Sequence, residues 1–343
     1  FDNRMNKLNQ DFQNAQQGGI PQYMLSVYVD SLMAKAQRLN VEKTAYQRKV
    51  MSDNKGMLLA SIISATIEMP APPKEYYKDR GRYQRYYVEH YYDNFPWNDI
   101  RIFSTPVGFN KIKDFNNVIY QADDPTLDTF VVAALNASKV NEESFYKFFD
   151  MTEKVLGSNI SPYKVEHTYI KMLENALTYP KLSEARKLRY QKELSYINKN
   201  LQGDTVPNFR MVMSNGDTTT LYDVKCEYML LYLQHPTCPT CLQVRARIAN
   251  YPALNNAIDN GKLKVLTVYF ENDKDVWANY LKNDANPHYI HGWNFDQTIE
   301  DKTLYDTRTI PYMFLLDKDK RVIKKDILVN EIEDYIQQLG IDK

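Results

Sequence analysis

The spacing of apolar residues divides the chain into two regions. Up to about residue 203, apolar positions recur every three or four residues, as in amphipathic helices, and no stretch alternates with period two for long. This spacing predicts helices over residues 20–39, 56–68, 75–92, 126–138, 142–156, 162–179 and 183–201. Prolines fall between several of these segments, where a residue without an N–H group ends a helix. Residues 1–203 are therefore expected to form an all-α helical domain.

From residue 204 onward, short apolar runs of strand length alternate with helical segments. The pattern predicts strands over residues 206–213, 228–234, 263–270, 312–316 and 322–327. It predicts helices over residues 240–249, 275–281 and 331–339. Strands that alternate with helices indicate a central sheet with helices on its faces. Residues 204–343 are therefore expected to form a separate α/β domain.

Composition excludes several classes of protein. The chain of 343 residues has 43 basic and 43 acidic side chains, so it lacks the basic excess that nucleic-acid binding needs. Its 43% hydrophobic content argues against intrinsic disorder. It contains neither GxGxxG nor GxxxxGK[ST], the loops that hold nucleotide phosphates, and we expect no cofactor. Its best apolar stretch, residues 57–67, is too short to cross a membrane.

Two of the three cysteines form the motif Cys238-Pro239-Thr240-Cys241, between the predicted strand 228–234 and the helix that follows it. Cys238 would lie at the helix N-terminus, where unpaired N–H groups and the helix dipole favour a thiolate. In such motifs the thiol pKa typically falls from ~8.5 to ~7. We expect Cys238 to be the attacking thiolate and Cys241, one turn further on, the resolving thiol of a redox-active disulfide.

Two other interpretations of these cysteines stay open. The pair could form a structural disulfide, although a four-residue loop gains little stability from closure. Alternatively, His235, Cys238 and Cys241 form an HxxCxxC run, and two histidines lie downstream at positions 288 and 291. The sequence has no second CxxC, so we expect no metal site. The third cysteine, Cys226, has no partner at useful spacing and is expected to be a buried apolar residue.

The segments MLLYLQHPTCPTC, LKVLTVYFEND and LYDTRTIPYMFLLDKDKRVIKKD follow one another in this order. Together they resemble the TlpA/ResA-like thiol–disulfide oxidoreductases, over about residues 204–343. The resemblance implies a thioredoxin-like fold with a central mixed sheet. In that fold a cis-proline faces the CxxC motif, and Ile310-Pro311 occupies the corresponding position. Ile310 and Pro311 are thereby implied to bind substrate.

The motif departs from its relatives at several positions. Thr237 stands where the family often has Trp, Tyr232 where thioredoxins have a buried Asp, and Val244 where TlpA/ResA proteins often have Glu. The usual carboxylate bases are therefore missing, which leaves the rate and the redox direction open. Peroxiredoxins share the fold, but Gln243 stands where their cysteine would be, which disfavours a peroxidase.

The helical region carries HYYDNFPWNDIRIFSTPV, which is similar to an uncharacterised helical domain that precedes TlpA-like domains in exported proteins of Gram-negative bacteria. This resemblance implies a periplasmic or otherwise extracytoplasmic location. No signal peptide is visible and the chain starts at Phe1, so we expect the native N-terminus, with a lipid anchor as one form of attachment, to lie upstream. The aromatic residues 76–97 could bind a peptide or sugar, but we favour helix packing between the two regions.

Two functional hypotheses follow. The first is an enzyme, a thiol–disulfide oxidoreductase that exchanges disulfides with exported protein substrates, draws on an electron donor and works on the reducing side. The alternative is a non-catalytic binding or scaffold protein whose thioredoxin-like domain has lost turnover. The intact CxxC motif and Pro311 favour the enzyme, and the missing carboxylates favour the alternative. Ile310 before Pro311 matches thioredoxin-like reductants, whereas Pro239 resembles more oxidising proteins.

Overall fold

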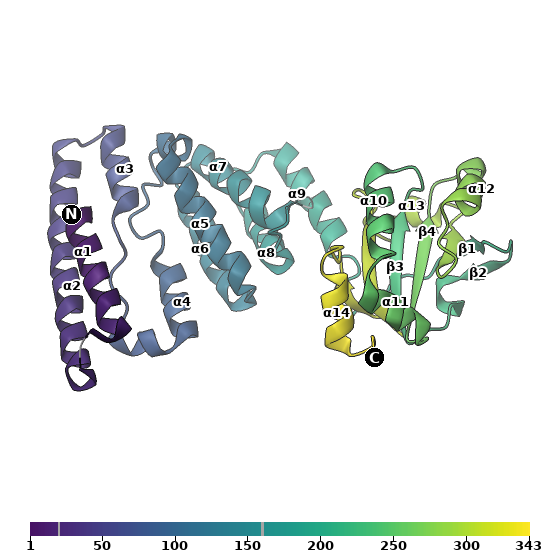
Figure 1. The fold of residues 1–343 in the computed structure, drawn as a ribbon. Helices are drawn as coiled ribbons and strands as arrows, with labels where there is room; N and C mark the ends of the chain where they lie inside the picture. The colour runs from purple at the N-terminus through teal and green to yellow at the C-terminus, as the bar shows by residue number, and fades with distance from the viewer. Residues whose placement is uncertain (20, 159–160) are drawn as a thin grey trace. The chain divides into compact units, whose positions relative to one another are not determined.

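The computed structural model describes residues 1–19, 21–158 and 161–343. The chain divides into two units, residues 1–190 and 191–343 (Figure 1). The first is built of helices, and the second contains a seven-stranded mixed sheet with helices. This confirms the predicted fold class. The predicted domain boundary after residue 203 concerns independent folding and stays a prediction. None of the helices in the described ranges is long and apolar enough to cross a membrane.

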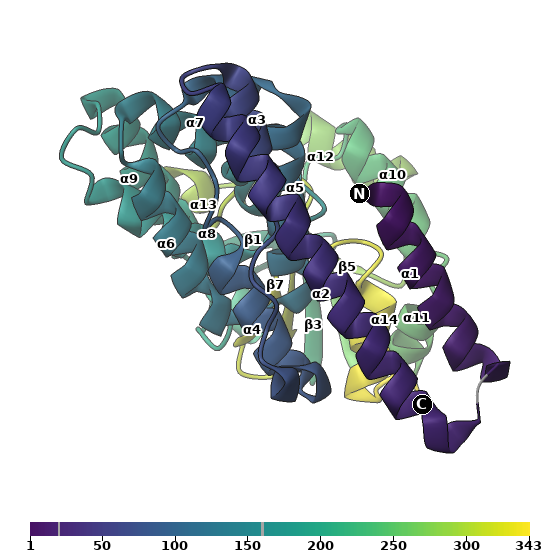
Figure 2. The same cartoon turned by 90° about the vertical axis from the view of Figure 1, so that its left-hand side faces the viewer.

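The first unit is a series of helices, with α1 and α3 packed against the long helix α2 (Figure 2). Its helices are α1 (Asp2–Asn14), α2 (Gln22–Asp53), α3 (Leu58–Thr66), α4 (Arg80–His90), α5 (Pro106–Ala122), α6 (Asp128–Ser138), α7 (Glu142–Thr152), α8 (Glu166–Leu177) and α9 (Glu184–Ile197). The last turns of α9 belong to the second unit. Short 3₁₀ or π-helical turns lie at residues 15–19, 74–78, 100–104, 125–127 and 153–157.

Two helices of this unit, α1 and α5, are not among those predicted. Helix α1 fully buries none of its side chains, and its apolar stripe is limited to the half-buried Met5, Leu8 and Phe12. Helix α5 does bury one, with Ile112, Phe115 and Ile119 at helical spacing, and this signal was available in the sequence. Thr105 caps α5 by accepting a hydrogen bond from the Gly108 N–H at 3.1 Å, and Pro106 occupies its first turn.

Aromatic rings form much of the core of the first unit. The three phenylalanines of α7, Phe145, Phe148 and Phe149, are fully buried. The ring of Phe148 lies 5.6 Å from that of Tyr92 and 5.0 Å from that of Trp97. The C-terminal part of the aromatic segment 76–97 thus packs within the first unit, whereas we expected it to pack between the two regions.

The sheet of the second unit has the strand order β2-β1-β5-β4-β3-β6-β7. Its strands are β1 (Arg210–Met213), β2 (Thr218–Thr220), β3 (Tyr228–Gln234), β4 (Leu263–Tyr269), β5 (Ile290–Trp293), β6 (Tyr312–Asp317) and β7 (Val322–Lys325). Strands β3, β4 and β5 run parallel, and the other neighbours pair antiparallel. Its helices are α10 (Pro239–Ile248), α11 (Pro252–Asp259), α12 (Lys274–Asn283), α13 (Thr298–Asp301) and α14 (Ile332–Leu339), with a 3₁₀ turn at residues 221–223.

The central strand β3 is buried on both faces. Met229, Leu231 and Leu233 point into one core, while Leu230 and Tyr232 point into the other, which side chains of α11 and α14 complete. Such a strand reads as a continuous apolar run in the sequence. Because β3 is fixed by neighbours on both sides, its C-terminal end is a rigid support for the loop that follows.

Candidate active site

The CxxC motif leaves the end of β3 and opens helix α10. Cys238 is the N-cap of α10, and its own N–H donates to the backbone oxygen of His235 at 3.1 Å. The backbone N–H of Cys241 donates to Cys238 Sγ at 3.4 Å. Both thiols are free, and Cys238 is partly exposed whereas Cys241 is fully buried. One sulfur is therefore accessible and the other is enclosed one helical turn away.

The surroundings of Cys238 favour its thiolate. Burial raises the pKa of this thiol, but hydrogen bonds from Cys241 and from the Thr240 N–H lower it, and the charge of Arg245 adds to them. The net effect places the pKa of Cys238 below its ordinary value. This is the direction expected for a thiol at a helix N-terminus.

The pKa of Cys241 shifts in the opposite direction. Burial is the main cause, and it raises the pKa of the Cys241 thiol to about 12. The proximity of Cys238 raises it further, while a hydrogen bond with the backbone of His235 and the charge of Arg245 lower it. The pair thus combines an accessible sulfur that ionises readily with an enclosed one that keeps its proton.

Tyr232, at the position where thioredoxins carry a carboxylate, cannot substitute for one. Its hydroxyl donates a hydrogen bond to the backbone oxygen of Cys241 at 3.0 Å. Burial holds the pKa of Tyr232 well above its usual range, so the ring stays neutral and acts as a donor. Its contribution is to fix the first turn of α10 on the core.

Arg245 is a component of the site that sequence reasoning missed. Its guanidinium donates to Gln234 Oε1 at 2.6 Å and to the backbone oxygen of Pro236 at 3.1 Å. It also lies 4.9 Å from the centre of the Tyr280 ring. Both hydrogen-bond acceptors are neutral, so they leave the positive charge of Arg245 uncancelled. Its position four residues after Cys241, on the same helical face, was the available signal.

His235 is a candidate metal ligand only in the alternative interpretation. In the structure its ring contacts Thr237 and Glu271. Its Nδ1 accepts from the Thr237 N–H at 3.2 Å, which leaves the proton on Nε2 facing Glu271 Oε2 at 3.3 Å. His291 is buried on β5, with Nδ1 at 2.7 Å from Thr267 Oγ1. Within the described ranges, His, Cys, Asp and Glu side chains form no group of three or more that could hold a metal ion.

Ile310 and Pro311 lie at the same end of β3 as the cysteines. The bond between them is a cis peptide. Strand β6 starts directly after it, and its first residue, Tyr312, pairs with Leu233 of β3 in antiparallel register. Pro311 therefore falls beside the end of β3, from which the CxxC loop departs. The sheet register thus brings all four predicted site residues to the C-terminal end of β3.

Cys226 lies just before the start of β3, whereas the CxxC motif follows the end of this strand. It is half-buried, packs against the core that contains Met229, and its sulfur lies 3.6 Å from Lys320 Nζ. We expected a buried apolar residue, whereas Cys226 is only half-buried and its sulfur has a polar neighbour in Lys320.

Comparisons with known proteins agree with this architecture. Residues 33–200 match a family described as a domain of unknown function, DUF5106. The chain is similar to the crystal structure of a thioredoxin-like protein from Bacteroides caccae, with 27% identity and a TM-score of 0.72. That similarity covers 80% of this chain and 98% of the other. The expected combination of a thioredoxin-like domain with a preceding helical domain is confirmed.

Shorter structures match about 40% of the chain. One is the C-terminal domain of an uncharacterized protein from Bacteroides fragilis, at 33% identity, covering 40% of this chain and 98% of that one with a TM-score of 0.39. Another is a thiol:disulfide interchange protein from Bacteroides sp., at 16% identity, covering 40% and 89% with a TM-score of 0.35. Among curated proteins, none matches this sequence.

Proposed function

We propose that this chain, a thioredoxin-like protein with an N-terminal DUF5106 domain, is a thiol–disulfide oxidoreductase that exchanges disulfides with exported proteins. The observation that carries the proposal is the contrast between the two thiols of one helical turn. Cys238 is accessible and its pKa is lowered, whereas Cys241 is enclosed and burial raises its pKa to about 12. Division into an attacking and a resolving sulfur requires this asymmetry.

In the reductive direction, the Cys238 thiolate attacks one sulfur of a substrate disulfide. The substrate S–S bond breaks, a mixed disulfide with Cys238 forms, and one substrate sulfur leaves and takes up a proton. Cys241 then loses its proton and attacks Cys238 Sγ, which releases the second substrate sulfur and leaves a Cys238–Cys241 disulfide. Two electrons pass to the substrate, and a thiol donor must return them to the cysteine pair.

Ile310 and Pro311 are proposed to contact the substrate chain beside the cysteines. Their place next to the end of β3 supports this role, as does the resemblance of the Ile-Pro sequence to that of thioredoxin-like reductants. The same resemblance supports the reducing direction. The similarity of the helical region to domains of exported proteins supports a periplasmic or otherwise extracytoplasmic location, where protein disulfides form.

The proposal is tested by insulin reduction with dithiothreitol as donor. Cys238→Ser should abolish turnover. Cys241→Ser, freed of dithiothreitol before insulin is added, should accumulate mixed disulfides with the substrate, because no resolving sulfur is present. Cys226→Ser is the matched control and should retain turnover. The reduction potential of the pair is expected in the lower half of the range from about −270 to about −120 mV.

Two results would contradict the enzyme. If Cys238→Ser reduced insulin as fast as the unmodified protein, another group would carry the reaction. If the unmodified protein showed no turnover above background and a potential well below about −300 mV, the pair would be a structural disulfide. The non-catalytic scaffold would then be favoured, in agreement with the missing carboxylates at Tyr232 and Val244.

A further inference from the structure

The loop of residues 302–311, between α13 and β6, forms no helix or strand although it carries Ile310 and Pro311. We call it the 302–311 loop. Its inner side is held by Tyr305, which is fully buried and whose hydroxyl donates to the backbone oxygen of Pro207 at 2.6 Å. Ile310 packs against the same core. The outer side of the loop needs a separate support.

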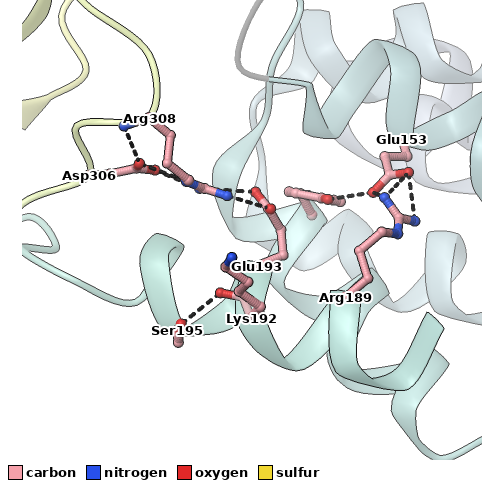
Figure 3. A network of polar contacts seen from close by, with 8 residues as sticks. Glu153, Arg189, Lys192, Glu193, Ser195, Asp306 and Arg308 are labelled. Carbon is pink, nitrogen blue, oxygen red and sulfur yellow. Dashed lines mark hydrogen bonds and ion pairs between the residues drawn. The ribbon is translucent and has the colours of Figure 1, made fainter. Parts of the chain in front are cut away.

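Arg308 supplies the contact on the outer side. Its Nη1 donates to Glu193 Oε2 at 2.7 Å, and its Nε and Nη2 donate to the two carboxylate oxygens of Asp306 at 2.8 and 2.6 Å (Figure 3). Glu193 belongs to the last turns of α9, within the same unit as the loop. The Arg308 guanidinium also lies 3.9 Å from the ring centre of Tyr196, three residues after Glu193.

Two more residues of this segment reach the loop backbone. Lys199 Nζ donates to the carbonyl oxygen of Thr303, and Asn200 Nδ2 donates to that of Leu304 at 3.0 Å. These bonds give hydrogen-bond partners to carbonyl groups that no regular structure satisfies. Residues 193–200 therefore contact the 302–311 loop at three positions along its length.

The segment 193–200 is itself fixed to the sheet. Lys325 of β7 donates from Nζ to the backbone oxygens of Ile197 and Lys199, at 2.5 and 3.2 Å. A cation at the C-terminal end of a helix also interacts favourably with the helix dipole. The support beneath the loop is therefore anchored to the strand next to β6.

We infer that residues 193–200 form a brace that positions the substrate-contacting loop, with Glu193 as its main positioning residue. This inference rests on the proposed function of Ile310 and Pro311. A substrate chain aligned along these residues needs their backbone at a fixed place, and small displacements of positioning groups cost large factors in rate. Among the described residues, no hydrogen bond or ion pair joins 193–200 to either cysteine, so the brace acts on substrate alignment and leaves the thiols unchanged.

The test compares Glu193→Gln with Glu227→Gln in the full chain. Glu227 is a matched control, since it forms an ion pair with Lys262 at 3.2 Å just before β3, and within the described ranges no hydrogen bond or ion pair joins it to the loop. Glu193→Gln should raise the KM for insulin roughly three- to tenfold, a small part of the effect that misplacement by an ångström can have. The pH profile of Cys238 alkylation and the reaction with a small aromatic disulfide should stay unchanged. Glu227→Gln should match the unmodified protein.

A second pair of variants addresses the ring beneath Arg308. Tyr196→Leu removes the stacking surface and should raise KM, whereas Tyr196→Phe keeps the ring and should restore the original value. Hydrogen exchange of the 302–311 amides gives a readout that needs no turnover, and it should accelerate in Glu193→Gln and Tyr196→Leu alone. Circular dichroism of each variant checks that the fold is intact.

The possible failures are distinguishable. Unchanged KM and unchanged exchange of the loop amides in Glu193→Gln would overturn the brace. A shifted alkylation profile of Cys238 would also overturn it, because the effect would then pass through the thiols. If the unmodified protein does not reduce insulin, the proposed function fails, and the exchange measurement alone decides whether the brace holds the loop.

Discussion

Cys238 and Cys241 are three residues apart, yet their pKa values move in opposite directions. The cause is position along the helix. Cys238 caps the first turn and its sulfur accepts a hydrogen bond from the Cys241 N–H. The Cys241 side chain is fully buried, which disfavours a charge on its sulfur. Arg245 favours ionisation of both sulfurs, and its neutral acceptors, Gln234 and Pro236, leave its charge available.

Removal of the Arg245 charge should slow the reaction of Cys238. In Arg245→Gln the pKa of Cys238 should rise, so the thiolate fraction at pH 7 and the rate of iodoacetamide labelling should fall by about two- to fivefold. Arg247→Gln, at an exposed position of the same helix, is the control and should label normally. Mass spectrometry should find the label on Cys238 before Cys226 or Cys241. Equal labelling rates in both variants would show that Arg245 has no electrostatic effect on Cys238.

Among the elements, the strands differ in how well the sequence reveals them. The run 228–234 coincides with β3, and β4 and β6 agree within one residue, because buried central strands need continuous apolar side chains. Strands β2 and β5 escaped prediction, since TTT and IHGW carry little apolar signal and are defined by their partners. The same limit applies to the site. The CxxC motif was visible, but the partners of Arg245 depend on the turn between β3 and α10.

Strand β5 is held by close packing at Gly292. A Cβ atom at this residue would lie 2.4 Å from Met211 Sδ of β1, the strand that pairs with β5. Gly292→Ala should therefore lower the free energy of unfolding of the second unit by about 1–3 kcal/mol, as measured by urea denaturation. Met211→Ala makes room for the added methyl group, so the double variant should be less destabilised than the two single effects add up to. Strict additivity would contradict a direct contact.

On the scale of the molecule, the position of the brace affects where an independent α/β domain can start. A domain that starts after residue 203 lacks Glu193, Lys199 and Asn200. Its strands still carry the apolar faces that form the core. Gly203 itself contacts the sheet, with its N–H donating to the Val322 oxygen at 2.8 Å. A fragment can thus keep its core and lose the support of one loop.

Two fragments test this boundary. Residues 204–343 should fold, give an α/β circular dichroism spectrum and label at Cys238, but melt several degrees below residues 191–343, because the shorter fragment lacks the brace. A loss of about 1 kcal/mol corresponds to a shift of roughly 3 °C in a domain of this size. If residues 204–343 were unfolded while residues 191–343 folded, the predicted boundary would be wrong.

The hydroxyl of Tyr232 donates to a backbone oxygen and does not take up the proton of the Cys241 thiol. The neighbours that shift the pKa of Cys241 are the His235 backbone, Cys238 and Arg245, and none of them is a carboxylate. Capture of a client protein should level off with pH once Cys238 is ionised, because its thiolate fraction is then complete. Release should keep accelerating at pH values above this plateau, because burial raises the pKa of the Cys241 thiol, a difference that single-turnover experiments at increasing pH can resolve. Above the pKa of Cys238, alkalinity would thus govern how long a client stays attached and leave its rate of capture unchanged.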